Sequence, residues 1–519
     1  MYDFMANDKC IFYFRLIIWL NMQHILAIDI GTTHCKAIVT DITGAIVSTS
    51  QKPCVSITTL PGQHEQEPDL MFDNVAALLR EAFAAFNNKS LTCVSFSCAM
   101  HGIMAIDVEG KPLTNIITWA DTRSNKYAEQ LLKSDDAFDI YSNAGTPIHA
   151  MSPLCKLMWL KNEQPEVFAK AHKFISFKEY VFYRLFGKFI IDHSLASATG
   201  LFNIHKKQWH EISLKYAGIT TGQLSNPVQV THQESTMLPG MMEWLGLNSA
   251  IPFVLGGSDG CLANLGCGAT RANELALTIG TSGAIRLVTP APYTFEINTV
   301  FNYLLTDDLF VVGGPTNNGG NVLQWFIEHV MKKKPDSGSF DEVLAMAANV
   351  SAGSDGLLFL PYLYGERSPV WDATARGCFI GLNASHTIQH MARAVVEGIC
   401  FGLFDIFSSM QGLQENVDVI YASGGFTRST FWLQMIADIF GKKVVLNDVA
   451  DASAMGAAMI GMVASGILKS VTDGKGMVKE GEIYLTDVCT HKKYLRSYDI
   501  YHHLYCKLKP EMEALNKLN

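Results

Sequence analysis

Two aspartates in glycine-rich surroundings have the residue types and spacing for phosphoryl transfer. Asp29 opens the turn DIGTT at residues 29–33, where glycine lets backbone N–H groups approach a ligand and Lys36 adds a cation suited to a polyphosphate. A carboxylate in that position can hold Mg²⁺, usually through water. Asp259 lies in the run GGSDG at residues 256–260, where an acid can orient an attacking hydroxyl. The simpler alternatives are an ordinary β-hairpin for the first stretch and a helix N-cap for Asp259.

The first of these stretches occurs twice in the chain. Residues 26–39 read LAIDIGTTHCKAIV and residues 275–288 read LALTIGTSGAIRLV, with leucine, alanine, isoleucine, glycine, threonine and valine at matching positions. A repeat at this distance is typical of two similar domains and not of a solenoid. We expect each domain to offer a phosphate-binding hairpin to a shared cleft. Because Thr278 stands in the second copy where the first has Asp29, the two halves have diverged in role.

A third group of side chains could bind a polyol. In the stretch IITWADTRS at residues 116–124, Trp119, Asp121 and Arg123 alternate, so in an extended segment they point to the same side. An aromatic wall, an acceptor and a forked donor would suit a polyol. The alternative is an ion pair between Asp121 and Arg123 beside a core tryptophan. His101, which follows an apolar strand-like run, is either a further ligand contact or a loop histidine with satisfied hydrogen bonds.

Composition limits the functions that the chain can have. With 519 residues, 48% hydrophobic and 17% charged, it is long enough for roughly two or three well-buried domains. Lys and Arg number 40 against 49 Asp and Glu, and the net charge of −9 argues against a broad basic face for nucleic acid. The 12 cysteines are scattered without a C-x-x-C pair, which is typical of free thiols in a reducing cytosol and not of a zinc site.

The first 21 residues differ in character from the rest. The apolar run at residues 11–20 is too short for a membrane-spanning helix and is interrupted by Arg15, and no small-residue cleavage site follows it. We therefore expect a cytoplasmic protein with neither a membrane anchor nor a secretory signal. Met22 directly precedes the first apolar strand. Our hypothesis is that Met22 is the natural start and that residues 1–21 are an appendage, disordered or non-native.

Hydrophobic periodicity supplies the elements that must position these candidates. Strands that alternate with helices predict an α/β fold with ligands at the strand ends. The expected strands cover residues 25–28, 37–39, 45–49, 91–97, 252–255, 310–314, 418–423 and 443–446. The expected helices cover residues 69–86, 320–331, 388–410, 429–440 and 452–465, with another beginning at Pro153.

The motifs in this order resemble the FGGY family of carbohydrate kinases. The turn at residues 29–33 and the run GTSG at residues 280–283 are similar to the family's two phosphate motifs. The run MSPLCKLMWLKNE at residues 151–163 fits its first signature. The nucleotide-binding end of the family is matched by residues 424–440 together with residues 452–458.

This resemblance, which runs from Met22 to about Ser465, implies a fold as well as an activity. The family fold consists of two actin-like (ribonuclease H-like) α/β ATPase domains with a cleft between them. In this chain we expect a sugar-side domain at residues 22–252, a nucleotide-side domain at residues 253–470 and a peripheral C-terminal tail at residues 471–519.

The resemblance also implies the roles of individual residues. Asp259 is the expected catalytic base, and Asp29 with Asp259 is expected to hold Mg²⁺. ATP is the expected phosphate donor, and its implied contacts are Gly31, Thr32, Thr33, Lys36, Gly280, Thr281, Gly320, Gln324, Gly425 and Ser429. The implied sugar contacts are Met100, His101, Trp119, Asp121 and Arg123.

Within the family, the stretches WADTRS, GTPIHAMSPLCKL and GERSPVWDATARG resemble the gluconate kinases more than the xylulose or glycerol kinases. We therefore expect phosphorylation of the terminal hydroxyl of a sugar acid, D-gluconate to 6-phosphogluconate. The substrate carboxylate needs a cation, and our hypothesis assigns it to His149 and Arg123, with His101 as a further candidate. The alternatives are a pentulose kinase of the xylulose kinase type and an actin-like ATPase without a sugar substrate. A homodimer is a possible assembly.

Overall fold

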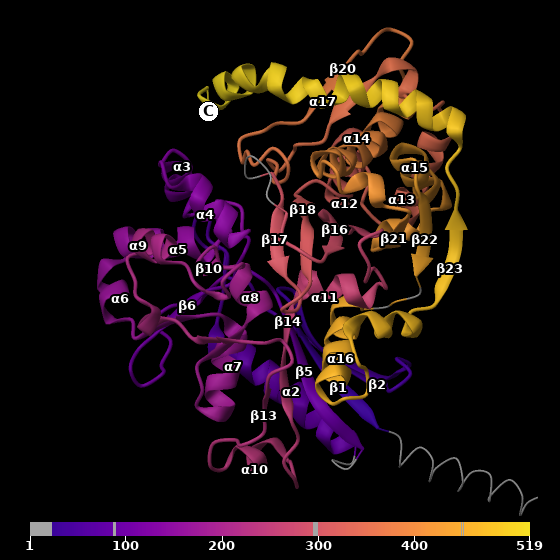
Figure 1. Ribbon diagram of the computed structural model, residues 1–519. Helices are drawn as coiled ribbons and strands as arrows, with labels where there is room; N and C mark the ends of the chain where they lie inside the picture. The colour runs from indigo at the N-terminus through magenta and orange to yellow at the C-terminus, as the bar shows by residue number, and fades with distance from the viewer. Residues whose placement is uncertain (1–22, 87–89, 294–298, 448, 450, 519) are drawn as a thin grey trace, which may run out of the picture. The chain divides into compact units, whose positions relative to one another are not determined.

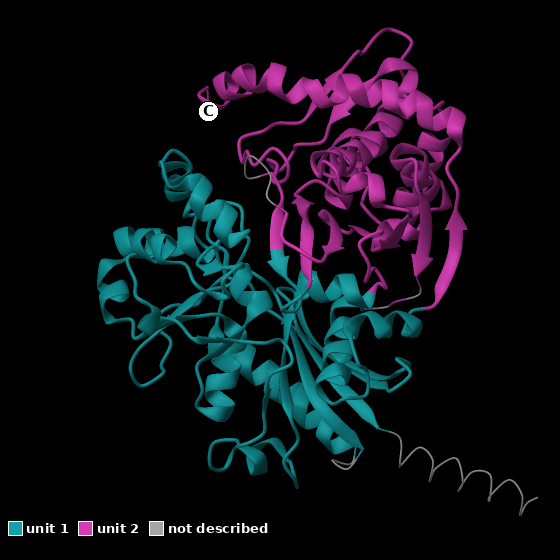
Figure 2. Ribbon diagram, viewed as in Figure 1, with its two compact units in different colours: residues 1–266, 303–308, 450–478 teal, residues 267–302, 309–449, 479–519 magenta. Residues whose placement is uncertain are grey.

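The computed structural model describes residues 23–86, 90–293, 299–447, 449 and 451–518, which form two compact units (Figure 2). The proposed appendage at residues 1–21 lies outside the described residues. Unit 1 comprises residues 1–266, 303–308 and 450–478, and unit 2 comprises residues 267–302, 309–449 and 479–519.

This division differs from the expected boundary between residues 252 and 253. The strand β14 (Phe253–Ser258) hydrogen-bonds in parallel to β5 (Leu91–Cys98), so it belongs to the sheet of unit 1. The chain also returns to unit 1 late, because the helix α16 (Ala452–Ala464) packs on the same sheet. Long-range pairing therefore sets the division, and a single cut point in the sequence does not describe it.

Unit 1 is built on a mixed sheet with the strand order β13-β14-β5-β1-β2-β3 (Figure 1). The strands β1, β2 and β3 form an antiparallel meander, and β5 and β14 run parallel to β1. Every residue of β1 is buried, as expected for a central strand covered on both faces. The bounds are β1 (His24–Ile30), β2 (His34–Asp41), β3 (Ile46–Pro53) and β13 (Gln233–Glu234).

Helices from distant parts of the chain cover this sheet. The helix α2 (Pro68–Ala85) contacts β1, β2 and β3, while α16 contacts β1, β5 and β14 (Figure 1). A Cβ atom on Gly456 of α16 would lie 2.0 Å from the carbonyl oxygen of Leu262 in α11 (Asp259–Gly266). Glycine is therefore required for α16 and α11 to pack this closely, and α11 is the helix that begins with Asp259.

Unit 2 is built on a second sheet, with the strand order β17-β18-β16-β15-β21-β22-β23. The strands β15 and β16 form an antiparallel hairpin, and β21 and β22 continue in parallel from β15. The strands are β15 (Glu274–Ile279), β16 (Gly283–Thr289), β17 (Phe301–Leu304), β18 (Phe310–Thr316), β21 (Val419–Ser423), β22 (Lys443–Asn447) and β23 (Glu480–Tyr484). The helices are α12 (Gly320–Trp325), α13 (Ser337–Ala348), α14 (Ile388–Ser409), α15 (Thr430–Phe440) and α17 (Val488–Asn516).

The two sheets confirm the internal repeat seen in the sequence. The order β3-β2-β1-β5-β14 in unit 1 corresponds to β18-β16-β15-β21-β22 in unit 2, with the same antiparallel meander and the same parallel neighbours. Both copies of the repeated stretch form the hairpin at the centre of their sheet. This duplicated arrangement is the α/β fold that the sequence predicted.

The remaining elements of unit 1 lie outside its main sheet, and several of the other expected site residues lie on them or in the loops between them. The short strands are β4 (Glu65–Gln66), β6 (Met104–Ile106), β7 (Ile116–Ile117), β8 (Lys173–Ile175), β9 (Ile190–Asp192), β10 (Phe202–Asn203), β11 (Gln208–Trp209) and β12 (Asn226–Val228). The helices are α3 (Asn125–Leu132), α4 (Ala137–Ala144), α5 (Pro153–Glu163), α6 (Pro165–Lys170), α7 (Phe177–Phe186), α8 (His193–Ser197), α9 (Glu211–Ala217) and α10 (Met241–Leu245).

The C-terminal stretch at residues 471–519 is less peripheral than expected. Its strand β23 pairs antiparallel with β22 at the edge of the second sheet. The long helix α17 that follows buries Tyr494, Tyr501 and Met512 in the core of unit 2. These contacts make the last part of the chain an integral layer of unit 2.

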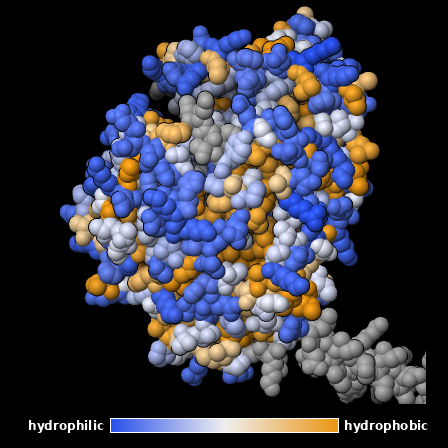
Figure 3. Space-filling view, viewed as in Figure 1, coloured by the Kyte–Doolittle hydropathy of each residue, from blue (hydrophilic) through white to orange (hydrophobic). Residues whose placement is uncertain are grey.

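The face of the molecule drawn in Figure 3 is predominantly polar. In Figure 3 hydrophilic side chains cover most of the face in view, with apolar residues between them. Across the described part of the chain, no helix combines the length and the apolar character needed to cross a membrane.

Candidate functional site

The carboxyl ends of three parallel strands bring the main candidates of unit 1 to one edge of the sheet. In the register of β1, β5 and β14, Ile30 lies opposite Cys98, and Cys98 lies opposite Ser258. Asp29 precedes Ile30 and Asp259 follows Ser258, so both acids lie at this edge. Ligands of α/β folds bind outside the carboxyl ends of parallel strands. The structure therefore brings together the two aspartates that the sequence singled out.

Asp29 is a buried acid in an unusual electrostatic position. Its Oδ1 atom has no hydrogen-bond partner among the described residues. Burial raises the pKa of Asp29 to about 7, and the nearby carboxylates of Asp451 and then Asp259 contribute to the same shift. The hydroxyl of Ser97 and, more weakly, the positive charge of Lys36 act in the opposite direction and lower the pKa. A buried carboxyl with this environment gains from a cation beside it.

The donor set fits Mg²⁺ held largely by water and phosphate. Among the described residues, no group of three or more His, Cys, Asp and Glu side chains is arranged to hold a metal ion. Mg²⁺ keeps several waters and is commonly bound through one or two carboxylates plus substrate phosphates, so a full protein cage is not required. The unpartnered oxygen of Asp29 is the best candidate ligand, and Asp259 is near enough to influence its charge.

Lys36 is already paired in this structure. Its Nζ atom lies 2.6 Å from Oδ2 of Asp451, whose Oδ1 accepts a hydrogen bond from the N–H of Ala454 (3.2 Å) and so caps α16. Burial lowers the pKa of Lys36, but the hydrogen bond to Asp451 and the negative charges of Asp451 and Asp29 together outweigh burial and raise the pKa above its ordinary value. The sequence predicted that Lys36 contacts the phosphates. In the structure its ammonium group is paired with Asp451, so a phosphate would have to share that ammonium group with the carboxylate.

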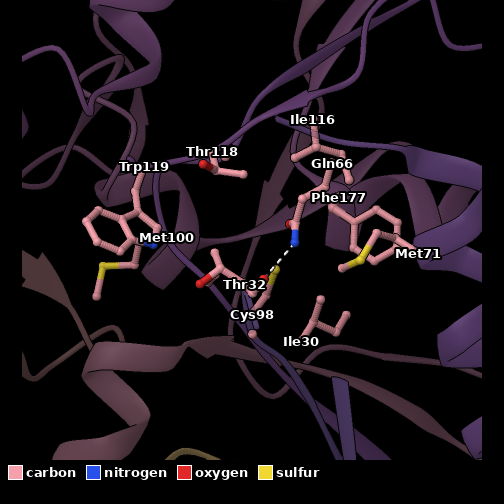
Figure 4. A pocket seen from close by; sticks show the side chains of 13 residues that line it. Ile30, Thr32, Gln66, Met71, Cys98, Met100, Ile116, Thr118, Trp119 and Phe177 are labelled. Carbon is pink, nitrogen blue, oxygen red and sulfur yellow. Dashed lines mark hydrogen bonds between the residues drawn. The ribbon is translucent and has the colours of Figure 1, made fainter. Parts of the chain in front are cut away.

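The turn between β1 and β2 is tight and well supported. The N–H of Gly31 donates to the carbonyl of His34 (3.1 Å), and a Cβ atom on Gly31 would lie only 2.9 Å from that carbonyl oxygen. The side chain of Gln66 donates to the carbonyl oxygen of Thr32 (2.8 Å) (Figure 4). Thr33 is exposed. The expected phosphate turn is therefore a rigid hairpin with an accessible tip.

Asp259 is the first residue of α11 and is half-buried. Its Oδ1 atom accepts a hydrogen bond from the N–H of the next residue, Gly260 (2.8 Å). The strand before it is irregular, because Gly256 has φ of 65° and a Cβ atom there would lie 1.7 Å from the carbonyl oxygen of Phe96. Only glycine allows this close approach, which sets the direction in which β14 delivers Asp259.

A buried polar network supports the turn that carries Asp259, and sequence reasoning missed it. Lys178 and Asp192, both fully buried, form an ion pair of 2.6 Å, and the ammonium group of Lys178 also donates to the carbonyl of Gly257 (3.1 Å). The hydroxyl groups of Ser194 and Ser258 are 2.9 Å apart. Because a buried charge pair rarely adds stability over apolar packing, its value here lies in fixing the β14–α11 turn.

Met100 and Trp119, two expected sugar contacts, line a small cavity with Gln66 and Thr118 (Figure 4). Figure 4 shows Trp119 and Met100 on one side of this cavity and the apolar Met71 on the other. Its volume of about 20 Å³ accommodates a hydroxyl group or a water molecule but not a whole sugar. The cavity can therefore form only part of a polyol site.

His101 follows β5 in a strained conformation. Its φ of 64° is uncommon for a residue with a side chain, and its carbonyl accepts a hydrogen bond from the fully buried ammonium group of Lys156 (2.6 Å). The imidazole Nδ1 atom lies 2.7 Å from the carbonyl oxygen of Ala198. Burial lowers the pKa of Lys156 to about 7. Lys156, which the sequence analysis did not select, thus holds the backbone of an expected sugar contact.

The trio Trp119, Asp121 and Arg123 does not form the predicted single row. The strand β7 ends at Ile117, and the N–H of Asp121 donates to the carbonyl of Thr118 (3.2 Å), so the chain turns where an extended segment was expected. The alternative prediction is confirmed in part, because Arg123 pairs with Asp121 at 2.7 Å and also with Glu65.

Arg123 and His149 lie in different surroundings from Trp119. The guanidinium group of Arg123 lies 4.3 Å from the ring centroid of Trp159, and both residues line an open groove of about 520 Å³. His149 is half-buried, and its Nδ1 atom accepts a hydrogen bond from the N–H of Met151 (3.2 Å). The two residues predicted to bind the substrate carboxylate, Arg123 and His149, are thus both half-buried, but Asp121 and Glu65 already neutralise Arg123.

In unit 2, three of the expected nucleotide contacts come together. The N–H of Gly320, at the start of α12, donates to the carbonyl of Gly280 (2.7 Å). The N–H of the next residue, Asn321, donates to the carbonyl of Thr281 (3.2 Å). The exposed hairpin tip of the second repeat therefore packs against the start of α12, and its carbonyl groups accept hydrogen bonds from the N–H groups of Gly320 and Asn321.

The other expected nucleotide contacts are less clearly assembled. Gln324 is exposed and donates to Glu328 (3.0 Å). Ser429 caps α15, since its hydroxyl oxygen accepts a hydrogen bond from the N–H of Trp432 (3.2 Å). Gly425 is exposed, and the preceding Gly424 has φ of 102° beside the end of β15. The roles of Gln324, Gly425 and Ser429 as ATP contacts stay predictions.

A buried glutamate braces the loop before α12. Glu366 accepts hydrogen bonds from the N–H groups of Asn317 (2.9 Å) and Arg367 (2.7 Å) with one oxygen, and from Thr316 Oγ1 (2.7 Å) and Asn318 Nδ2 (3.1 Å) with the other. Burial nevertheless raises the pKa of Glu366. The run GERSP at residues 365–369 was noted in the sequence without a role, and this network gives its glutamate one.

Comparison with known proteins identifies the same architecture. Residues 24–266 match the model of the N-terminal domain of the FGGY family of carbohydrate kinases, and residues 275–465 match that of the C-terminal domain. The gluconokinase of Bacillus subtilis is 40% identical over 455 residues, covering 86% of this chain and 89% of that protein. The xylulose kinase of Staphylococcus epidermidis is 30% identical, covering 93% and 97%. The crystal structure of gluconate kinase from Lactobacillus acidophilus superposes with a TM-score of 0.90 at 33% identity, covering 96% of this chain and 100% of that chain.

Proposed function

Because the chain belongs to the FGGY family of carbohydrate kinases, we propose that it phosphorylates D-gluconate to 6-phosphogluconate. Members of this family use ATP as the phosphate donor. The observation that carries the substrate assignment is the 40% identity with the gluconokinase of Bacillus subtilis, against 30% for the xylulose kinase of Staphylococcus epidermidis. A pentulose kinase is the second candidate, because those xylulose kinase matches extend over 93% of the chain.

We assign the role of catalytic base to Asp259. In this proposal its carboxylate accepts the proton of the terminal hydroxyl as that oxygen attacks the γ-phosphate of ATP. General-base assistance of this kind contributes ~10²–10⁴ in rate. Asp259 directly follows β14, and the buried Lys178, which pairs with Asp192, donates to the carbonyl of Gly257 two residues before it. This support fixes the position of the Asp259 carboxylate and leaves the residue half-buried, as a catalytic base requires.

For the phosphates of ATP we propose contacts from Gly31 and the hydroxyls of Thr32 and Thr33 in unit 1. In unit 2 we propose contacts from Gly280, Thr281 and Gly320. A Mg²⁺ ion at Asp29 would neutralise charge on the phosphates. The sugar would contact Met100, His101 and Trp119, of which Met100 and Trp119 line one cavity.

The cation for the gluconate carboxylate is proposed to come from His149 and Arg123. Arg123 already pairs with Asp121 and Glu65, so a substrate carboxylate would have to share it with two acids, and His149 accepts a hydrogen bond from the N–H of Met151. We expect His149→Ala and Arg123→Ala each to raise KM for gluconate, with KM for ATP unchanged in both. An unchanged KM for gluconate would remove that residue from the role.

The deciding experiment measures ADP release from ATP and Mg²⁺ with D-gluconate, D-xylulose, L-ribulose, glycerol or no sugar. Turnover with gluconate alone supports the proposal. Turnover with a pentulose and not with gluconate would refute the substrate assignment but leave the assignment as a sugar kinase intact. ADP release at the same rate with every sugar and with none would refute both assignments. We place the reaction in the cytoplasm, since the described cysteines are free thiols of the kind kept in a reducing compartment.

A further inference from the structure

Two cysteines meet directly beneath the first phosphate turn. The Sγ atoms of Cys35 and Cys54 are 3.6 Å apart, and the Sγ atom of Cys54 is also 3.6 Å from the carbonyl oxygen of Gly31. Both cysteines are free thiols. The contact therefore joins a pair of potentially reactive groups to a turn expected to bind nucleotide.

Sheet register explains why these two thiols meet. In the antiparallel pair of β2 and β3, Cys35 lies opposite Lys52, so Cys54 is two residues further along on the same face. The N–H of Cys54 donates to the carbonyl of Thr33 (2.8 Å), which extends the strand pairing one step beyond β3. Diagonal neighbours on one face are within reach of each other's side chains. The two sulfur atoms are thus held together by the backbone.

The two thiols also differ in a way that suits redox chemistry. Cys54 is half-buried and Cys35 is fully buried. The hydrogen bond from Cys35 lowers the pKa of the Cys54 thiol, while the same contact, together with burial, raises the pKa of the Cys35 thiol. An accessible thiolate with a second thiol beside it is the arrangement of a redox-sensitive cysteine and its resolving partner.

We propose that hydrogen peroxide converts Cys35 and Cys54 to a reversible disulfide, and that this modification weakens nucleotide binding by the turn at residues 31–33. The Cys54 thiolate attacks one peroxide oxygen and becomes a sulfenic acid as hydroxide leaves. The sulfur of Cys35 then displaces the hydroxyl group as water. Two thiols lose two electrons, and the peroxide is reduced to two waters after hydroxide takes up the proton that Cys54 had released.

The expected effect on the turn follows from geometry. A disulfide holds its sulfur atoms about 2.05 Å apart, so the two atoms must approach by roughly 1.5 Å. The movement is coupled to the turn, because the N–H of Gly31 donates to the carbonyl of His34 (3.1 Å), the residue before Cys35, and the Sγ atom of Cys54 lies 3.6 Å from the carbonyl oxygen of Gly31. The disulfide should therefore displace the backbone groups that are expected to face the phosphates.

The test uses the full-length protein and two independent readouts. After treatment with hydrogen peroxide, non-reducing peptide mass spectrometry should find the segments containing Cys35 and Cys54 joined and two hydrogens lighter. Equilibrium binding of ATP should weaken by roughly ten- to a hundredfold, the scale of a displacement of about 1 Å in a binding site, and dithiothreitol should restore it. Cys54→Ser should bind ATP as the reduced protein does and should not respond to peroxide.

A double variant, Cys489→Ser with Cys506→Ser, is the matched control, because both of these cysteines are exposed. It should keep the full response. Absence of the Cys35–Cys54 link, or an equal response in Cys54→Ser, would overturn the proposal, and a link without a change in ATP affinity would overturn its second part. The effect on nucleotide rests on the proposed function, but neither readout requires gluconate turnover, so failure of the substrate assignment is distinguishable.

Discussion

Replacing Asp29 with asparagine should stabilise the metal-free protein while destroying its activity. Burial and the neighbouring acids Asp451 and Asp259 raise the pKa of Asp29 from 3.8 to about 7. Below pH 3.8 this carboxyl is neutral in both the folded and the unfolded state. Between pH 3.8 and about 7 the folded state holds a proton that the unfolded state has released, so the free energy of unfolding falls as the pH rises, and the loss is complete above pH 7.

The size of the effect follows from the same shift. At about 1.4 kcal/mol per pKa unit, the shift at Asp29 lowers the free energy of unfolding, relative to its value at low pH, by about 4.5 kcal/mol at pH 8, where the carboxyl is ionised in both states, and by about 2 kcal/mol at pH 5, where only the unfolded state has released the proton. Asparagine has nearly the same shape and carries no charge. Asp29→Asn should therefore exceed the wild type in stability by these amounts, with the difference growing as the pH rises.

Urea denaturation in EDTA at pH 5, 6, 7 and 8 measures this difference, with Asp73→Asn on an exposed position of α2 as the matched control. Adding Mg²⁺ should stabilise the wild type and leave Asp29→Asn unchanged. A variant that is less stable than the wild type at pH 8, or a difference that does not grow with pH, would refute the electrostatic reasoning.

Three further changes test the other parts of the site. Asp259→Asn should lower kcat by about 10²–10⁴ and leave ATP affinity and the melting temperature unchanged; retained turnover would exclude Asp259 as the base. Lys178→Met should cost about 3–5 kcal/mol in the free energy of unfolding because Asp192 is left buried and unpaired, and adding Asp192→Asn should recover part of it, as urea denaturation would show. Glu366→Gln should lower the free energy of unfolding by about 1–3 kcal/mol and raise KM for ATP, because the NH₂ group of glutamine would replace an oxygen that accepts hydrogen bonds and would face groups that donate them. An unchanged KM for ATP would limit Glu366 to a structural role.

The local patterns in the sequence predicted the hairpins and the strand-end acids. Asp29 and Asp259 could be placed because each follows an apolar strand, and parallel strands end at one edge of a sheet. The internal repeat correctly predicted two related sheets.

Partners that are distant in the sequence could not be predicted in this way. Lys36 pairs with Asp451, and no local spacing encodes a contact across that length of chain. The row of Trp119, Asp121 and Arg123 failed for a local reason: alternation implies a common face only in an extended segment, and the chain turns after Thr118. Buried supports such as Lys178 and Glu366 are also invisible in sequence, because a charged residue is ordinarily expected at the surface.

The two hairpins show how one fold can divide a chemical task between its copies. In unit 1 the strand β1 carries Asp29 one residue before its end, and the negative charge of this buried acid is unfavourable unless a cation lies beside it. At the matching position of unit 2, the hydroxyl of Thr278 lies 2.8 Å from that of Ser423 on the neighbouring strand, a neutral pair with no such cost. A neutral edge accepts an anionic phosphate without repulsion, whereas an acidic edge requires a metal ion between itself and the phosphate. The loss of the acid in the second copy therefore has a physical consequence: the turn of unit 1 can bind a phosphate only together with a metal ion, whereas the turn of unit 2 can bind one directly.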